Sequence, residues 1–169
     1  VGMHAAILGE ARLGKSIVIL GAGTIGLMVL QACKSLGATD ITVVDVMDKR
    51  LDLAKELGAS RTINGAKEDT VALLRSEELF GDHGVELVFE CAGSTANQAV
   101  QIVARGGKIM MVGTQSKPVP IDFLKINREV TIQTSFRYCN NYPQTIEAIR
   151  SGKFNVKDMV THVYDYKDV

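Results

Sequence analysis

Two hydrophobic patterns alternate along the chain from one end to the other. Short, nearly continuous apolar runs that are rich in β-branched residues are typical of parallel strands buried on both faces of a sheet. The segments between them carry apolar residues three or four positions apart, as in helices with one buried face. The runs predict strands at 16–20, 41–44, 61–63, 85–90, 108–112 and 129–135, and the spaced segments predict helices within 1–11 and at 27–36, 48–57, 67–80 and 142–149.

A further helix is expected to begin at Ser94, a good N-cap residue, and to carry Val100, Ile102 and Val103. Right-handed crossovers between successive parallel strands then predict one six-stranded sheet with the strand order 3-2-1-4-5-6. Residues 1–169 are therefore predicted to form a single domain, an α/β fold of the Rossmann type with a doubly wound parallel sheet. Residues 105–107 should turn into the fifth strand, and 121–126 fits either a short strand or a helical turn.

The first strand runs directly into a glycine fingerprint, Gly21-Ala22-Gly23-Thr24-Ile25-Gly26, which is followed at once by a helix. In a strand, turn and helix unit, Gly21 would form the tight turn and Gly23 would let a pyrophosphate approach bare backbone. Gly26 would let the helix pack closely on the strand. The free N–H groups at the start of that helix would face the phosphates. The motif in this context predicts a dinucleotide-binding site.

An acidic residue, Asp45, ends the second strand about twenty residues beyond the glycines, as the fingerprint requires. A carboxylate there accepts hydrogen bonds from both hydroxyls of an adenosine ribose and repels a 2′-phosphate, so NAD is predicted over NADP. The alternative is that Asp45 only caps the turn before the helix at 48–57. Arg50 could lie over the adenine or reach the ribose, or it could simply be solvated.

Other candidate ligand contacts follow the carboxyl ends of the later strands, where ligands bind in such sheets. Cys91 fits a small buried residue better than a nucleophile, since no histidine is near it in sequence. Arg137 and Tyr138 follow the sixth strand and are unusual as core residues, although Arg137 could also form a structural salt bridge. The residues expected to flank the nicotinamide half of the cofactor are Cys91 to Ser94, Val112, Gly113, Thr114, Ser135, Phe136, Arg137 and Tyr138.

The composition of the chain excludes several classes of binding partner. The formal net charge is zero, so neither nucleic acid nor an anionic membrane is expected as a partner, and no run is long enough to span a bilayer. No basic segment precedes a small-residue cleavage site, so a secreted protein is not expected. Three separated cysteines argue against a disulfide framework and for a reducing compartment, so a cytoplasmic protein is predicted. His4, His83 and His162 are isolated, which makes a metal site in this chain improbable.

With these residues in hand, nearly the whole chain resembles the cofactor-binding domain of medium-chain, zinc-dependent alcohol dehydrogenases, and within them the sorbitol or polyol dehydrogenase branch. The most specific match is the run 136–143, Phe-Arg-Tyr-Cys-Asn-Asn-Tyr-Pro, with 160–162 after it. The other matching pieces are 18–26, Asp45 with Arg50, 53–59, 90–93, 106–108 and 111–113. The resemblance implies that NAD contacts Ile25, Asp45, Arg50, 112–114 and 135–137, and that Arg137 and Tyr138 bind polyol hydroxyls.

The chain also departs from that family. The resemblance implies a catalytic zinc held by a second domain, and no set of ligands for that zinc is present here. Because the chain opens at Val1 in what looks like mid-helix, we expect a piece of a longer polyol dehydrogenase that binds NAD but turns nothing over. Alternatives are a relative acting on threonine, butanediol or a simple alcohol, which a different pair at 137–138 would have favoured, or a stand-alone NAD(H)-sensing module. A homo-oligomer through the sheet edge at 119–135 is a further hypothesis.

Overall fold

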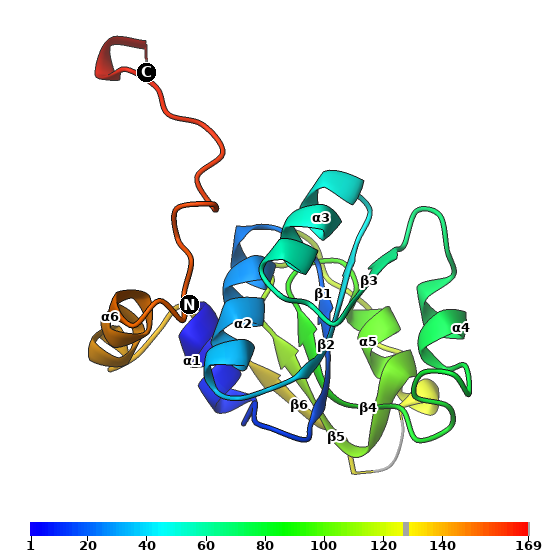
Figure 1. The fold of residues 1–169 in the computed structure, drawn as a ribbon. Helices are drawn as coiled ribbons and strands as arrows, with labels where there is room; N and C mark the ends of the chain where they lie inside the picture. Colours follow the sequence, from blue (N-terminus) through cyan, green and yellow to red (C-terminus); the bar gives the residue numbers. More distant parts are fainter. Residues whose placement is uncertain (127–128, 169) are drawn as a thin grey trace.

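The computed structural model of the protein describes residues 1–126 and 129–168, and its strands form one parallel sheet (Figure 1). The strand order β3-β2-β1-β4-β5-β6 and the α/β fold are as predicted. The strands are β1 (Ser16–Leu20), β2 (Asp40–Asp45), β3 (Arg61–Asn64), β4 (Val85–Glu90), β5 (Val103–Met111) and β6 (Thr131–Thr134). The strand order reverses between β1 and β4, so the crevice expected for a ligand lies at the carboxyl ends of these two strands.

Helices cover both faces of the sheet (Figure 1). Successive residues of β1 point to opposite faces: Ile17 and Ile19 pack in one buried cluster, and Val18 and Leu20 pack in a second cluster. This two-sided burial explains why the strands are continuously apolar rather than alternating. The helices are α1 (Gly2–Leu8), α2 (Thr24–Ser35), α3 (Asp48–Glu56), α4 (Thr70–Leu74), α5 (Ala96–Ile102) and α6 (Tyr142–Arg150), with 3₁₀ turns η1 (Phe123–Lys125) and η2 (Tyr166–Asp168).

The segment predicted as a helix at 67–80 is helical only over α4. The side chain of Asp69 caps α4 by accepting hydrogen bonds from the N–H groups of Val71 and Ala72, so the helix starts later than predicted. Arg75 follows α4, and its guanidinium donates to the carbonyl oxygens of Gln101, Gly81 and Asp82. These long-range contacts hold 76–84 in turns, which the local apolar spacing could not indicate.

Two predicted boundaries around α5 were also wrong. Ser94 is not the N-cap: α5 begins at Ala96 after Thr95, and the N–H groups of Ser94 and Thr95 donate to the carboxylate of Glu90. The turn predicted at 105–107 lies inside β5, which begins at Val103 and changes register against β4 between Val85 and Leu87. The open question at 121–126 resolves as η1.

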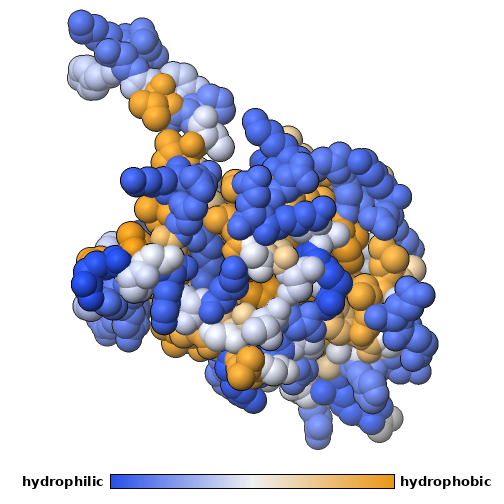
Figure 2. Space-filling view, viewed as in Figure 1, coloured by the Kyte–Doolittle hydropathy of each residue, from blue (hydrophilic) through white to orange (hydrophobic). Residues whose placement is uncertain are grey.

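The C-terminal segment is anchored to the domain as far as Met159, which is partly buried against the core. Phe154 is buried in the core, and the amide of Gln31 on α2 exchanges two hydrogen bonds with the backbone of Asn155. Residues 160–168 extend away from the sheet (Figure 1), and Figure 2 shows apolar surface on this extension. Val163 is among its exposed apolar residues.

The sheet ends at β6, whose residues are largely exposed. The homo-oligomer through 119–135 stays a prediction, and two residues of that segment, 127 and 128, lie outside the described residues. None of the helices formed by 1–126 and 129–168 has the length and apolar character needed to cross a membrane.

Candidate functional site

The turn between β1 and α2 has a geometry that only glycine permits at two positions. Gly21 has φ +105°, in the left-handed region, and a Cβ there would lie 3.0 Å from the backbone nitrogen of Ala92. A Cβ at Gly26 would overlap the carbonyl oxygen of Gly21. Gly23 differs from both, because a Cβ at Gly23 would meet nothing within 4 Å. The start of α2 therefore faces open space at Gly23, which fits the close approach of a phosphate.

Asp45, at the end of β2, fixes two turns at once. Its Oδ2 accepts a hydrogen bond from the Ala22 N–H at 2.7 Å, and its Oδ1 accepts from the N–H groups of Val46 and Met47 at 2.9 and 3.0 Å. The side chain is 6% exposed, and a guanidinium nitrogen of Arg50 lies 3.6 Å from Oδ2. Asp45 thus caps the turn before α3, the alternative considered from the sequence, and it also ties that turn to the glycine fingerprint.

A cavity of about 340 Å³ opens at this point, at the lower end of the range for ligand pockets. Asp45 and Arg50 lie on its β2 side, and the loop after β4 forms the facing wall. Of the predicted site residues it is lined by Gly21, Gly23, Asp45, Arg50, Cys91, Ala92 and Ser94, together with Leu20, Val44, Val46, Gly65, Thr70, Thr95 and Gln98. Thr70, Thr95 and Gln98 were missed, because they belong to helix starts rather than to strand ends.

The other predicted residues do not line this cavity, but several lie next to its wall. A Cβ at Gly93 would come within 2.6 Å of the carbonyl oxygen of Thr114, so the loops after β4 and β5 touch. The N–H of Ser135 donates to the carbonyl of Met111 at 2.8 Å, which continues the row to the end of β6. The predicted residues outside the cavity lining are Ala22, Thr24, Ile25, Gly26, Gly93, Val112, Gly113, Thr114, Ser135, Phe136, Arg137 and Tyr138.

The loop after β6 holds an unusual backbone. Arg137 has φ +52°, in the left-handed region, which is uncommon for residues other than glycine and which tends to cluster at functional sites; Glu10, Glu129 and Asn140 share it. Its guanidinium lies 5.2 Å from the ring centroid of the exposed Phe136, and among the described residues it forms no ion pair. Tyr138 packs edge-to-face on Tyr142 and lines a separate cavity. In this structure Arg137 and Tyr138 therefore stand apart from the cavity beside Asp45.

Glu90 is a further candidate functional residue, which the sequence motifs indicated only as part of the run 90–93. It ends β4, its side chain is fully buried, and its carboxylate accepts hydrogen bonds from the loop that walls the cavity. The signal available in the sequence was a charged residue at the end of an otherwise apolar strand.

The three cysteines differ in accessibility: Cys33 is buried, Cys91 is partly buried and Cys139 is exposed. Burial raises the pKa of the Cys91 thiol, and the neighbouring carboxylate of Glu90 raises it further. Because the thiolate is the nucleophile, this direction of shift makes Cys91 unreactive.

We expect Ellman's reagent at pH 8 to titrate one thiol per chain rapidly in the folded protein, and all three after unfolding. The rapid phase should vanish in Cys139→Ser, since Cys139 alone is exposed among the three. A rapid thiol remaining in that variant would show that Cys91 is activated.

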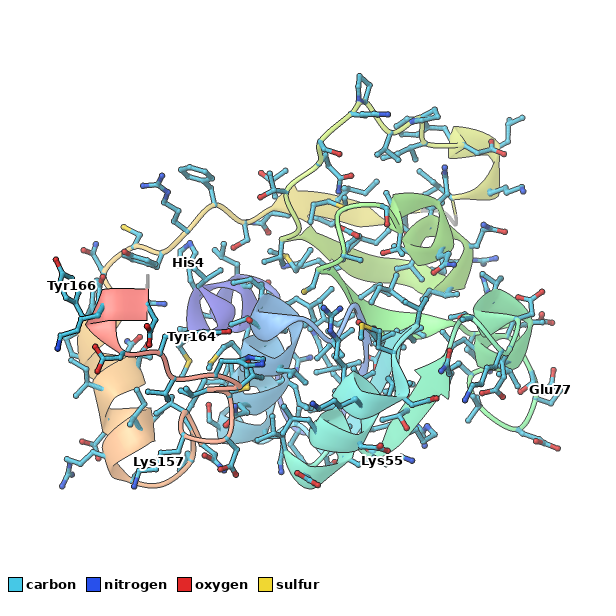
Figure 3. The ribbon with its side chains drawn as sticks, turned by 90° about the horizontal axis from the view of Figure 1, so that it is seen from above. His4, Lys55, Glu77, Lys157, Tyr164 and Tyr166 are labelled. Carbon is cyan, nitrogen blue, oxygen red and sulfur yellow. The ribbon has the colours of Figure 1, made fainter. Side chains whose placement is uncertain are left out.

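The residues that the structure describes do not fit a zinc ion. Within 1–126 and 129–168, no group of three or more His, Cys, Asp or Glu side chains could hold a metal. Figure 3 shows that two of these side chains, His4 on α1 and Glu77 in the loop after α4, lie far apart. No step of the chemistry is therefore assigned to zinc within this chain.

Comparison with known proteins agrees with this architecture. The sequence model of a family described as "Zinc-binding dehydrogenase" matches residues 24–151, which is most of the chain. The chain belongs to this family. This match confirms the resemblance to the cofactor-binding domain of medium-chain zinc-dependent dehydrogenases that the sequence predicted. The family is one of oxidoreductases.

Two relatives and one solved structure show how far the similarity extends. The domain is 64% identical over 171 residues to the "Uncharacterized zinc-type alcohol dehydrogenase-like protein YdjJ" of Escherichia coli (strain K12), covering 100% of this chain and 49% of that protein. It is 39% identical to a "Sorbitol dehydrogenase" of Bacillus subtilis (strain 168), covering 97% and 47%. A crystal structure of an oxidoreductase/dehydrogenase of unknown specificity from Escherichia coli superposes with a TM-score of 0.92 at 62% identity, covering 99% and 48%. The chain thus spans about half the length of the curated relatives it matches.

Proposed function

We propose that this domain binds NAD at the carboxyl edge of its sheet and that the whole protein transfers a hydride from a polyol to it. The observation that carries the proposal is the combination of the open Gly23 turn with a buried carboxylate, Asp45, on the wall of the same cavity. An adenosine ribose held by Asp45 on the cavity wall, beside Arg50, would leave the pyrophosphate at the N-terminus of α2. The cofactor, once bound, supplies the hydride acceptor.

The residues of this chain would bind and orient the cofactor rather than carry out the chemistry. Asp45 would exchange its hydrogen bond with the Ala22 N–H for ribose hydroxyls or share it with them, and its negative charge would repel the 2′-phosphate of NADP. Val112, Gly113, Thr114 and Ser135, which lie along the same edge, would flank the nicotinamide half.

A polyol substrate is favoured by the loop after β6. Arg137 offers a fork of donors, Tyr138 offers a hydroxyl, and both suit a molecule with several adjacent hydroxyl groups. The strained backbone of Arg137 supports a functional role for its position. A sorbitol dehydrogenase among the relatives supports the same substrate class.

Calorimetric titration of this chain tests the cofactor half of the proposal. We expect saturable binding of NAD and AMP, with NADP binding at least about tenfold more weakly, which corresponds to about 1.4 kcal/mol. Equal binding of NAD and NADP would reject the role of Asp45 in selection. Failure of NAD and AMP alike to bind would reject the site.

A further inference from the structure

The carboxylate of Glu90 is held by an unusual set of partners. Its Oε1 accepts hydrogen bonds from the N–H groups of Gly93, Ser94 and Thr95 at 2.7, 3.2 and 3.2 Å, and from the Thr95 hydroxyl at 2.8 Å. Its Oε2 accepts from the side-chain amide of Gln115 at 3.1 Å. All five partners are donors, and among the described residues no lysine or arginine pairs with it. A buried carboxylate is costly unless it is satisfied in this way.

The two oxygens reach two different loops. Oε1 binds the loop 91–95, which walls the cavity opposite Asp45, and Oε2 binds Gln115 in the loop that follows β5. Where these loops meet there is no spare room, since a Cβ at Gly113 would lie 2.8 Å from Oε2 and 2.5 Å from the nitrogen of Gly93. The position of one loop therefore depends on that of the other, with Glu90 between them.

We propose that Glu90 is a positioning residue for the cofactor: it lines no part of the cavity, yet its two oxygens set where the walls around the adenosine and nicotinamide halves stand. The proposal rests on NAD binding at this site. It assigns Oε1 to the adenosine wall, through 91–95, and Oε2 to the nicotinamide side, through Gln115 and the adjoining Val112, Gly113 and Thr114. The sequence predicted 91–94 on the nicotinamide side, but three of these four residues line the same cavity as Asp45.

Because the two oxygens are assigned to different halves of the site, a variant that loses only one contact can distinguish the positioning role from a purely structural role of Glu90. Gln115 does not line the cavity, so Gln115→Leu removes only the Oε2 contact. NAD occupies both halves of the site, whereas AMP occupies only the adenosine half. Gln115→Leu should therefore lower the affinity for NAD severalfold and leave the affinity for AMP unchanged.

Glu90→Gln keeps the shape of the side chain but removes its charge and replaces one acceptor oxygen by an NH2 donor. The donors that face the new NH2 group lose their acceptor, and the hydrogen bonds to the remaining oxygen lose charge assistance, which roughly doubles the strength of such bonds. We expect the affinities for NAD and AMP both to fall about tenfold. We also expect the amide hydrogens of Gly93, Ser94 and Thr95 to exchange faster, as measured by nuclear magnetic resonance. Glu86→Gln is the matched control, because Glu86 lies on the same strand and accepts from the Ser16 N–H at 2.9 Å at an exposed position.

The outcomes separate this proposal from the proposed function. If wild-type protein binds neither NAD nor AMP, the cofactor site itself is rejected. If wild-type protein binds both, but folded Glu90→Gln binds them with unchanged affinity, Glu90 is only a structural residue and the positioning role is overturned. If Glu90→Gln fails to fold, Gln115→Leu decides alone: an equal loss for NAD and AMP, or no loss for either, contradicts the division between the two oxygens.

Discussion

Replacing Gly26 by alanine is expected to destabilise the domain by at least about 3 kcal/mol, at the upper end of the cost of overpacking a core. The added Cβ would overlap the carbonyl oxygen of Gly21 and lie 2.9 Å from its carbonyl carbon. Both are backbone atoms of the tight turn, so no side-chain rotation can relieve the clash, and α2 must move away from β1. Urea unfolding followed by circular dichroism should show a large fall in the midpoint.

Gly23→Ala is the matched control three residues away. Gly23 has φ −69°, which alanine adopts readily, and a Cβ there meets nothing within 4 Å. We expect the stability of this variant to stay close to wild type while its affinity for NAD falls at least about tenfold, since the methyl group occupies the space proposed for the pyrophosphate. Wild-type stability of Gly26→Ala would contradict the packing argument, and wild-type NAD affinity of Gly23→Ala would move the pyrophosphate away from this turn.

The sequence predicted the sheet because its signals are local and redundant. Six strand runs, the helices between them and the handedness of crossovers reduce the possible strand orders to a few, and the glycine fingerprint on the first strand favours the one that the structure has. The end of β1 illustrates why: Leu20 is fully buried and the next residue, Gly21, already has the left-handed φ of the turn. Pattern and turn chemistry agree there, and the element boundary is correct.

The failures lie where hydrogen bonds between side chains and backbone, rather than apolar spacing, decide the local structure. Arg75 holds 76–84 in turns by bonding carbonyls as far away as Gln101, so a helical apolar pattern did not become a helix. Ser94 has the chemistry of an N-cap, but its N–H donates to Glu90, and α5 starts later. Neither partner could be identified from residue spacing.

The candidate site divides in the same way. Residues tied to strand ends and to the glycine turn, such as Gly21 and Asp45, lie together on one cavity. Arg137 and Tyr138 lie on the loop after β6, where Arg137 has a left-handed φ and Tyr138 packs on Tyr142. Neither residue lines the cavity beside Asp45. The sheet topology places residues at strand ends, such as Gly21 and Asp45. The positions of Arg137 and Tyr138 could not be predicted from hydrophobic periodicity.

Asp45→Ala is expected to have the largest effect on cofactor binding. Hydrogen bonds to a charged group contribute about 1.5–3 kcal/mol each, so the loss of two ribose contacts should weaken NAD binding at least about 100-fold. Removing the negative charge also removes the repulsion of a 2′-phosphate, so NADP should lose little affinity or gain some. Competitive titration of the two cofactors against wild type and variant measures this change of preference.

The same carboxylate stabilises the fold, and the experiment must separate its two roles. In Asp45→Ala the N–H groups of Ala22, Val46 and Met47 lose their acceptor, so the free energy of unfolding should fall by about 1–3 kcal/mol. Asp52→Ala, at an exposed position on α3, is the control and should change neither property. A variant that is less stable but keeps wild-type affinity and preference for NAD would show that Asp45 serves only the turns. A variant that remains folded and exchanges NAD for NADP would show that one buried carboxylate both builds the wall of the site and selects the cofactor.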